Sequence, residues 1–124
     1  ILPDLHYGRD ALAGTALFLN FMAETDKKAS AIRAQYRTYF MVKDKMGIEG
    51  VDLPGLLKFI AEKHQHRRQD DIDGLKIYFD QGWVHLRKSN TEPIIRIYCE
   101  STTEDLANEL IARIKEDIDK FNLS

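Results

Sequence analysis

The chain has 124 residues, of which 44% are apolar and 31% charged, and its formal net charge is −2. This length and composition are typical of one compact globular domain with a short additional segment. The slight acidic excess disfavours general binding to nucleic acids or anionic membranes. Cys99 is the single cysteine, which excludes a disulfide within the chain and favours a reducing, cytoplasmic location. The apolar run 11–23 is interrupted by polar residues and is too short to cross a bilayer.

Residues 1–35 are predicted to form a helical segment separate from the main domain. Asp10 is placed to cap a helix that ends near Glu24, and a second short helix is expected over 27–35. Apolar side chains surround the first helix, which predicts burial on more than one side; they include Leu12, Ala13, Ala16, Leu17, Leu19, Phe21 and Met22. We therefore expect the chain to self-associate through this segment. Because the sequence opens on Ile1-Leu2-Pro3 without an initiator Met, we interpret it as a piece of a longer protein.

Residues 36–124 are predicted to form an α+β domain. Strands are expected over 36–45, 75–79, 83–88 and 94–100, a helix after Asp52, and a last helix that a capping box over 101–104 begins and that ends near Phe121. Short turns between adjacent strands favour a four-stranded, mainly antiparallel sheet. Each helix has a single apolar stripe, given for the last one by Leu106, Leu110, Ile114 and Ile118, so both should cover one face of the sheet. The other face should stay open, with Tyr78, Trp83, His85, Arg87, Arg96 and Tyr98 on it.

The stretch from Arg87 to Arg96 has the composition of a phosphate-binding loop. Alternation in the strands on either side places Arg87 and Arg96 together on the open face, beside the mouth of the loop. Guanidinium groups, hydroxyl and amide side chains and free backbone N–H groups are the donors that a phosphate dianion requires. The spacing alone is equally compatible with a solvated hairpin loop that carries two surface arginines.

The same stretch, Arg87-Lys88-Ser89-Asn90-Thr91-Glu92-Pro93-Ile94-Ile95-Arg96, resembles the phosphate-binding loop of the α-D-phosphohexomutases. The resemblance extends to Asp73-Gly74-Leu75-Lys76-Ile77 and to the segment 3–12, and thus covers most of the chain. It implies that residues 36–124 are the family's C-terminal domain, with a fold similar to that of the TATA-box-binding protein, and that residues 1–35 end the preceding domain. Asn90 stands where many members have Gly.

The resemblance implies a parent enzyme that interconverts hexose 1-phosphates and hexose 6-phosphates through a phosphoserine and a bisphosphate intermediate. In such enzymes the loop clamps the phosphate that is not transferred, a role that falls here to Arg87, Ser89, Asn90, Thr91 and Arg96. The family's serine segment, its Mg²⁺-binding aspartate loop and its sugar-recognition loop have no counterpart in this sequence. We therefore expect no catalytic residue, metal ligand or mutase activity in this chain, and expect the hexose phosphate and the parent's other domains as its partners. The sugar stays open among glucose, mannose and glucosamine phosphates.

The four histidines are further candidates. His64 and His66 lie in a polar connector with no third metal ligand nearby, so a solvated loop is the favoured interpretation. His6, together with Arg9, is expected mainly to cap and pack the first helix, and is a weak candidate for substrate contact. His85 shares the face of Arg87, but a surface role is favoured over acid–base catalysis.

Two other classes of function remain open. The open sheet face is superficially similar to a platform on which single-stranded nucleic acid stacks, and it carries Lys76, Tyr78, Trp83, Arg87 and Tyr98. A purely structural fragment without ligand affinity is the third interpretation. The net negative charge argues against nucleic acid.

Overall fold

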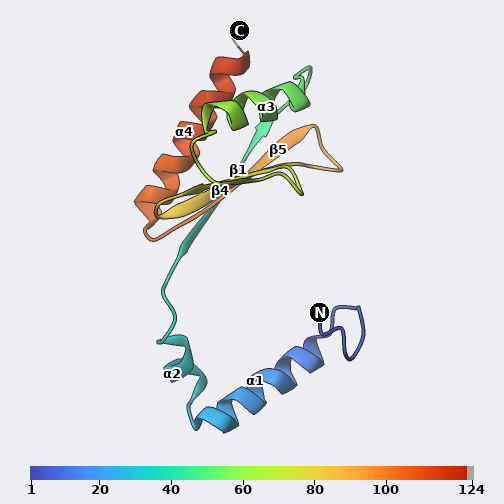
Figure 1. Ribbon diagram of the computed structural model, residues 1–124, viewed down its shortest axis with the longest axis vertical. Helices are drawn as coiled ribbons and strands as arrows, with labels where there is room; N and C mark the ends of the chain where they lie inside the picture. The colour runs from blue at the N-terminus through green and yellow to red at the C-terminus, as the bar shows by residue number, and fades with distance from the viewer. Residues whose placement is uncertain (123–124) are drawn as a thin grey trace. The chain divides into compact units, whose positions relative to one another are not determined.

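The computed structural model describes residues 1–122 and divides the chain into two compact units. The first is Ile1–Arg37 and the second begins at Thr38, two residues after the predicted boundary. Figure 1 labels their elements, which are α1 (Ala11–Thr25), α2 (Ala29–Arg33), β1 (Phe40–Gly47), α3 (Leu53–Lys63), β2 (Gln69–Asp70), β3 (Leu75–Phe79), β4 (Gly82–Lys88), β5 (Ile94–Ser101) and α4 (Glu104–Asn122).

The first unit consists of α1, the shorter α2 and a turn closed by a bridge between Leu2 and His6. The predicted cap is confirmed, because Asp10 Oδ1 accepts a hydrogen bond of 2.8 Å from the Ala13 N–H. However, α1 has no buried residue, whereas its apolar sequence predicted burial on more than one side. The reason is that one short helix and a turn offer too little surface to surround it.

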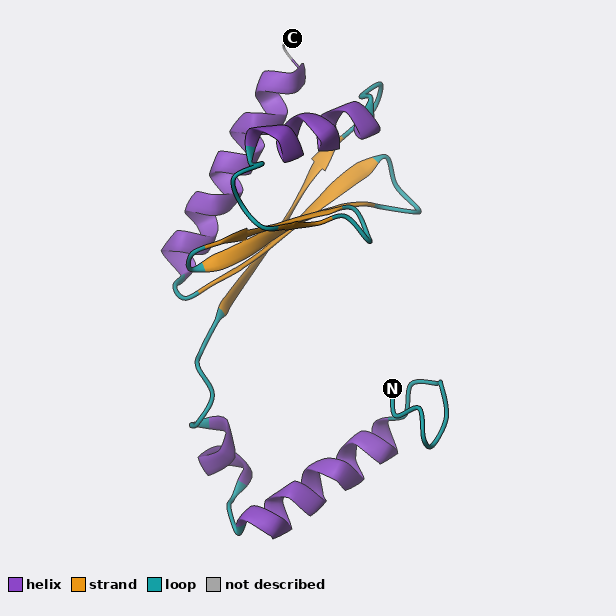
Figure 2. Ribbon diagram, in the orientation of Figure 1, coloured by secondary structure: helices purple, strands orange, loops and turns teal. Residues whose placement is uncertain are grey.

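The second unit contains an antiparallel sheet of five strands in the order β1-β5-β4-β3-β2, shown in orange in Figure 2. The sequence predicted four, and the additional strand, β2, lies in what was expected to be a charged connector. Its two residues pair with Ile77 and Lys76 of β3. In addition, the Gln69 amide donates to the carbonyls of Ala61 at 2.9 Å and His64 at 2.8 Å, at the end of α3. A two-residue strand has no periodic pattern that a sequence can reveal.

The first strand of this sheet lies later in the sequence than expected, at 40–47 instead of 36–45. Its register explains the difference: Phe40 pairs with Ser101, the last residue of β5, so a residue before Phe40 has no partner on that strand. The start of α4 also differs. Ser101 ends β5 and its hydroxyl donates to the Gln81 carbonyl at 2.8 Å, while Thr103 Oγ1 accepts from the Leu106 N–H at 3.2 Å. Thr103 therefore caps the helix, and the predicted capping box is wrong.

Both α3 and α4 pack on the same face of the sheet, as predicted and as Figure 1 shows. The buried apolar stripe of α4 is Ala107, Ile111, Ile114 and Ile118; Leu110 packs against it, and Leu106 is partly exposed. The predicted stripe took every fourth residue. Because a helix has 3.6 residues per turn, such positions move gradually around its surface, and the predicted stripe is therefore shifted at its start. Beneath the helices lie the inward side chains of the strands, including Ile77, Val84, Leu86, Ile95, Ile97 and Cys99. No helix within residues 1–122 has the length and apolar character that a membrane crossing requires.

Candidate anion-binding site

The site lies where β4 ends and β5 begins, at the loop 89–93 that joins them. In the register of the two strands Arg87 lies directly opposite Arg96, which confirms the pairing predicted from the alternation. Two cations at directly opposed positions repel each other. Negative charge nearby, from the protein or from a ligand, would offset this repulsion.

Ser89 is the first residue of the loop and is buried, with an exposed fraction of 4%. Its N–H donates to the Ile94 carbonyl at 3.0 Å, which continues the hairpin by one more backbone bond. Its hydroxyl oxygen accepts from an Arg96 Nη at 3.3 Å and from the Thr91 N–H at 3.4 Å. The loop is also tied to the segment before α3, because the Ile48 N–H donates to the Pro93 carbonyl at 2.9 Å. The polar groups of the loop are thus held in place by the surrounding backbone.

A hollow of about 210 Å³ opens at this point. Its lining contains all five predicted site residues together with two neighbours: Arg87, Lys88, Ser89, Asn90, Thr91, Arg96 and Tyr98. Three of these side chains are cationic and none is acidic. Combined with the hydroxyl and amide groups, this lining is chemically suited to an oxyanion of the size of phosphate.

Two carboxylates border the hollow and supply the countercharge. Asp73 Oδ2 lies 3.1 Å from Arg87 Nε, and Glu92 Oε2 lies 3.9 Å from an Arg96 Nη. Asp73 belongs to the segment 73–77 that resembles the family, but its pairing with Arg87 was not predicted. The only sequence signal was the adjacent Gly74, since a glycine before a strand often marks a close approach of two backbones.

Two of the histidine candidates, His85 and His6, have structural partners. His85 Nε2 lies 2.6 Å from the Asp73 carbonyl oxygen, so the ring anchors the turn before β3. His6 Nε2 lies 3.0 Å from Asp10 Oδ2, and its Nδ1 accepts from the Gly8 N–H at 2.8 Å. The geometry of His6 therefore agrees with the expected capping role, while Arg9 is exposed.

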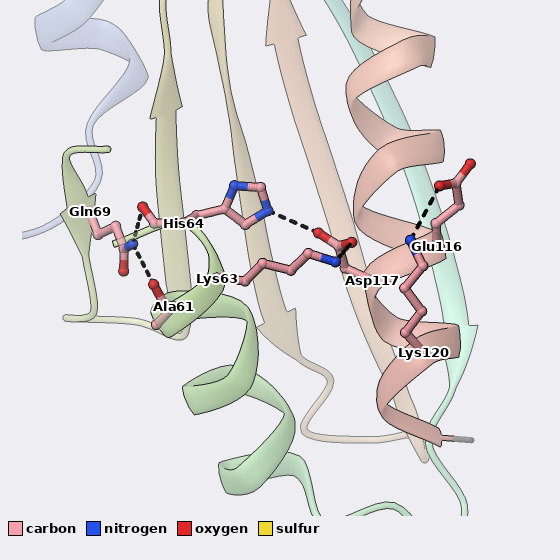
Figure 3. Close-up of polar contacts among 7 residues, drawn as sticks. All are labelled: Ala61, Lys63, His64, Gln69, Glu116, Asp117 and Lys120. Carbon is pink, nitrogen blue, oxygen red and sulfur yellow. Dashed lines mark hydrogen bonds and ion pairs between the residues drawn. The ribbon is translucent and has the colours of Figure 1, made fainter. Parts of the chain in front are cut away.

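His64 does not lie in a solvated loop, and this expectation was wrong. It is buried with an exposed fraction of 5%, and its Nε2 lies 2.9 Å from Asp117 Oδ2. Lys63 binds the other oxygen of the same carboxylate, and Figure 3 shows both side chains reaching from α3 to α4. Burial alone would raise the pKa of Asp117, but the hydrogen bonds from Lys63 and His64 outweigh it and hold that pKa below its ordinary value. This network joins the two helices, on the side of the sheet opposite the hollow.

Residues 38–117 match the family described as phosphoglucomutase/phosphomannomutase, C-terminal domain. The chain belongs to this family. A phosphoglucomutase/phosphomannomutase of Thermococcus kodakarensis is 38% identical over 113 residues, which are 90% of this chain and 25% of the relative. A phosphoglucosamine/phosphogalactosamine mutase of Sulfurisphaera tokodaii is 32% identical over 117 residues, which are 92% of this chain and 26% of the relative.

A solved structure agrees with the fold. The crystal structure of a phosphoglucomutase/phosphomannomutase family protein from Burkholderia thailandensis matches 73% of this chain and 19% of its own, with a TM-score of 0.51 and 23% identity. At this identity the match supports the fold alone. The chain spans about a quarter of the length of the curated relatives it matches.

The resemblance also implied Mg²⁺ in the parent enzyme. Within residues 1–122 there is no group of three or more His, Cys, Asp or Glu side chains that could hold a metal ion. The hollow itself is lined by cations, which would repel Mg²⁺. These residues do not fit the ion, and we assign it no part in what this domain does.

Proposed function

We propose that the hollow binds the phosphate group of a hexose phosphate, as the C-terminal domain of a cytoplasmic phosphohexomutase. The observation that carries this proposal is the opposed pair Arg87 and Arg96, with Ser89 hydrogen-bonded to Arg96, at the wall of one cationic hollow. Asn90 and Thr91 complete the donor set. We also propose that the sheet and its two helices resemble the fold of the TATA-box-binding protein.

In the parent enzyme this domain would contribute positioning and no covalent chemistry. Holding the phosphate that is not transferred directs the other end of the sugar to a phosphoserine in another domain, which lowers the entropic cost of the transfer. A bisphosphate intermediate must then reorient, and a clamp that recognises only a phosphate group can hold either of its ends. The proposal leaves the sugar open, since the hollow offers no group that is specific for a sugar ring.

Phosphate titration of the chain, followed by ¹⁵N NMR, tests the site. Charge-assisted hydrogen bonds contribute about 1.5–3 kcal/mol each before desolvation and ordering are subtracted, so we expect a Kd in the millimolar range. Arg87→Ala or Ser89→Ala should weaken binding strongly without unfolding the domain. Arg113→Ala, which removes an exposed arginine of α4 outside the hollow, is the matched control and should bind as the native chain does. Full phosphate affinity in Arg87→Ala would contradict the assignment, as would full catalytic efficiency of the same variant in a complete enzyme.

The chain by itself should show no mutase activity. A coupled assay with glucose 1-phosphate or mannose 1-phosphate should stay at the rate of buffer alone. Turnover that survives repurification of the chain would contradict this expectation.

The nucleic-acid alternative is disfavoured by the open face itself. Its aromatic rings are already covered by cations of the same chain: Lys76 Nζ lies 4.0 Å from the Trp83 ring centre, and the Arg68 guanidinium lies 4.6 Å from that of Tyr78. A base would have to displace these groups in order to stack. Binding of a single-stranded oligonucleotide more tightly than phosphate, under equal salt conditions, would favour the alternative.

A further inference from the structure

Within residues 1–122, Arg87 contacts an acidic side chain through one of its guanidinium nitrogens, in an ion pair. Its Nε lies 3.1 Å from Asp73 Oδ2. A guanidinium group has five N–H donors in a rigid plane, and a partner at Nε leaves both Nη groups for a ligand. With Nε paired to Asp73, rotation of the plane away from the hollow would separate the two charges of this ion pair.

Asp73 is itself fixed by the backbone around it. The His85 ring binds its carbonyl oxygen at 2.6 Å. The next residue, Gly74, has a φ of +84°, and a Cβ added there would lie 2.1 Å from the Leu86 carbonyl oxygen and 3.2 Å from the Arg87 Cα. The turn before β3 thus lies directly on the β4 backbone, at the residue that carries the guanidinium. The carboxylate is therefore presented to Arg87 from a rigid support.

Glu92 is a different kind of neighbour. Its oxygen lies 3.9 Å from the Arg96 Nη, which is too far for a hydrogen bond. It is half-exposed and lies in the loop, within four residues of its partner. Such a carboxylate lowers the local positive charge without fixing the orientation of Arg96, which Ser89 already binds.

We propose that Asp73 is a positioning residue for Arg87, whereas Glu92 acts only as a competing countercharge at the same site. The proposal rests on the proposed function, since the group that Arg87 is positioned to bind is the phosphate. Both partners of the Asp73–Arg87 pair are about half-exposed, at 58% and 48%. Exposed pairs of this kind contribute little to stability. We therefore infer that the main effect of this contact is to orient the Arg87 guanidinium group, which binds the ligand.

Two matched variants, Asp73→Ala and Glu92→Ala, separate orientation from charge. Each removes one carboxylate beside the hollow, so an effect of charge alone would tighten phosphate binding in both. Positioning predicts opposite results: Asp73→Ala should weaken binding by about threefold or more, and Glu92→Ala should leave it unchanged or tighten it. Asp73→Asn keeps an oxygen beside Nε but removes the charge of the ion pair, and should retain part of the affinity. Phosphate affinity of Asp73→Ala equal to or above that of the native chain would overturn the proposal.

A second readout requires no ligand. The Arg87 Nε–H signal in ¹⁵N NMR spectra should show slowed exchange in the native chain and in Glu92→Ala, and exposed-type exchange in Asp73→Ala. Circular dichroism melts of the three proteins verify that the domain stays folded. If the native chain binds no phosphate, the proposed function fails, yet this signal still decides the positioning. An Arg87 signal that does not change in Asp73→Ala would overturn it.

Discussion

Asp117 is a buried carboxylate whose two oxygens are bound by Lys63 and His64. Replacing it with Asn removes the charged acceptor on which the Lys63 and His64 side chains converge. We expect the free energy of unfolding at pH 7 to fall by about 1–3 kcal/mol in urea denaturation. Glu116→Gln is the control, because Glu116 is the adjacent, exposed residue of the same helix, and its removal should cost less than about 0.5 kcal/mol. Equal losses in the two variants would contradict a specific role of the network.

The same carboxylate predicts a dependence of stability on pH. Its pKa in the folded chain lies below its ordinary value of 3.8, so the folded state binds this proton less readily than the unfolded state does. The stabilisation is therefore fully present above the unfolded pKa and is lost as pH falls through the folded one. The difference in stability between the native chain and Asp117→Asn should shrink between about pH 5 and about pH 3. A difference that stays constant over this range would contradict the prediction.

At the level of single residues, the sequence could reveal those contacts that form between residues near each other in the chain. Arg87 and Arg96 could be placed together because strand alternation and one short loop determine their pairing. His64 could not be placed correctly, because its partner Asp117 is 53 residues away in the sequence. The role of Asp73 could not be predicted for the same reason. Its contact with Arg87 crosses the strand pair β3–β4, and no local pattern encodes it.

The turn between β2 and β3 is the element that holds Asp73 in place, and its packing depends on Gly74. Gly74→Ala would place a Cβ 2.1 Å from the Leu86 carbonyl oxygen at a φ of +84°. Because neither the conformation nor the space is available, we expect a loss of about 2 kcal/mol or more in the free energy of unfolding. Gly47→Ala, at the end of β1, is the control: nothing lies within 4 Å of its added Cβ, and stability should hardly change. Urea denaturation that ranks Gly47→Ala below Gly74→Ala in stability would contradict the packing argument.

Among the elements, those with a long apolar period were predictable, and the short ones were not. The strands β3, β4 and β5 and the helices α3 and α4 have alternating or helical apolar patterns that determine their faces. The strand β2 exists because Gln69 binds the end of α3 and because β3 has a free edge, and neither cause is local. The open edge of β5 likewise determines where β1 begins.

At the scale of the whole chain, the first unit exposes more apolar surface than a monomeric protein usually does. Leu12 is 83% exposed, Leu17 56% and Leu19 57%, and no residue of α1 is buried. Burial of even two such side chains stabilises an association by about 3–6 kcal/mol. We therefore predict that the chain self-associates through residues before about Gln35, by contact or exchange of α1 between copies.

Size-exclusion chromatography with light scattering, on this chain and on a version that begins near Tyr36, tests that prediction. The longer protein should elute with a mass above that of one chain at micromolar concentration, and the shorter one should remain a monomer. The double variant Leu12→Lys, Leu17→Lys in the full chain should also shift it towards the monomer, because it places charge on the apolar surface that association would bury. If both lengths elute as monomers, or if the shorter version associates just as strongly, the surface responsible lies outside α1 and the prediction is wrong.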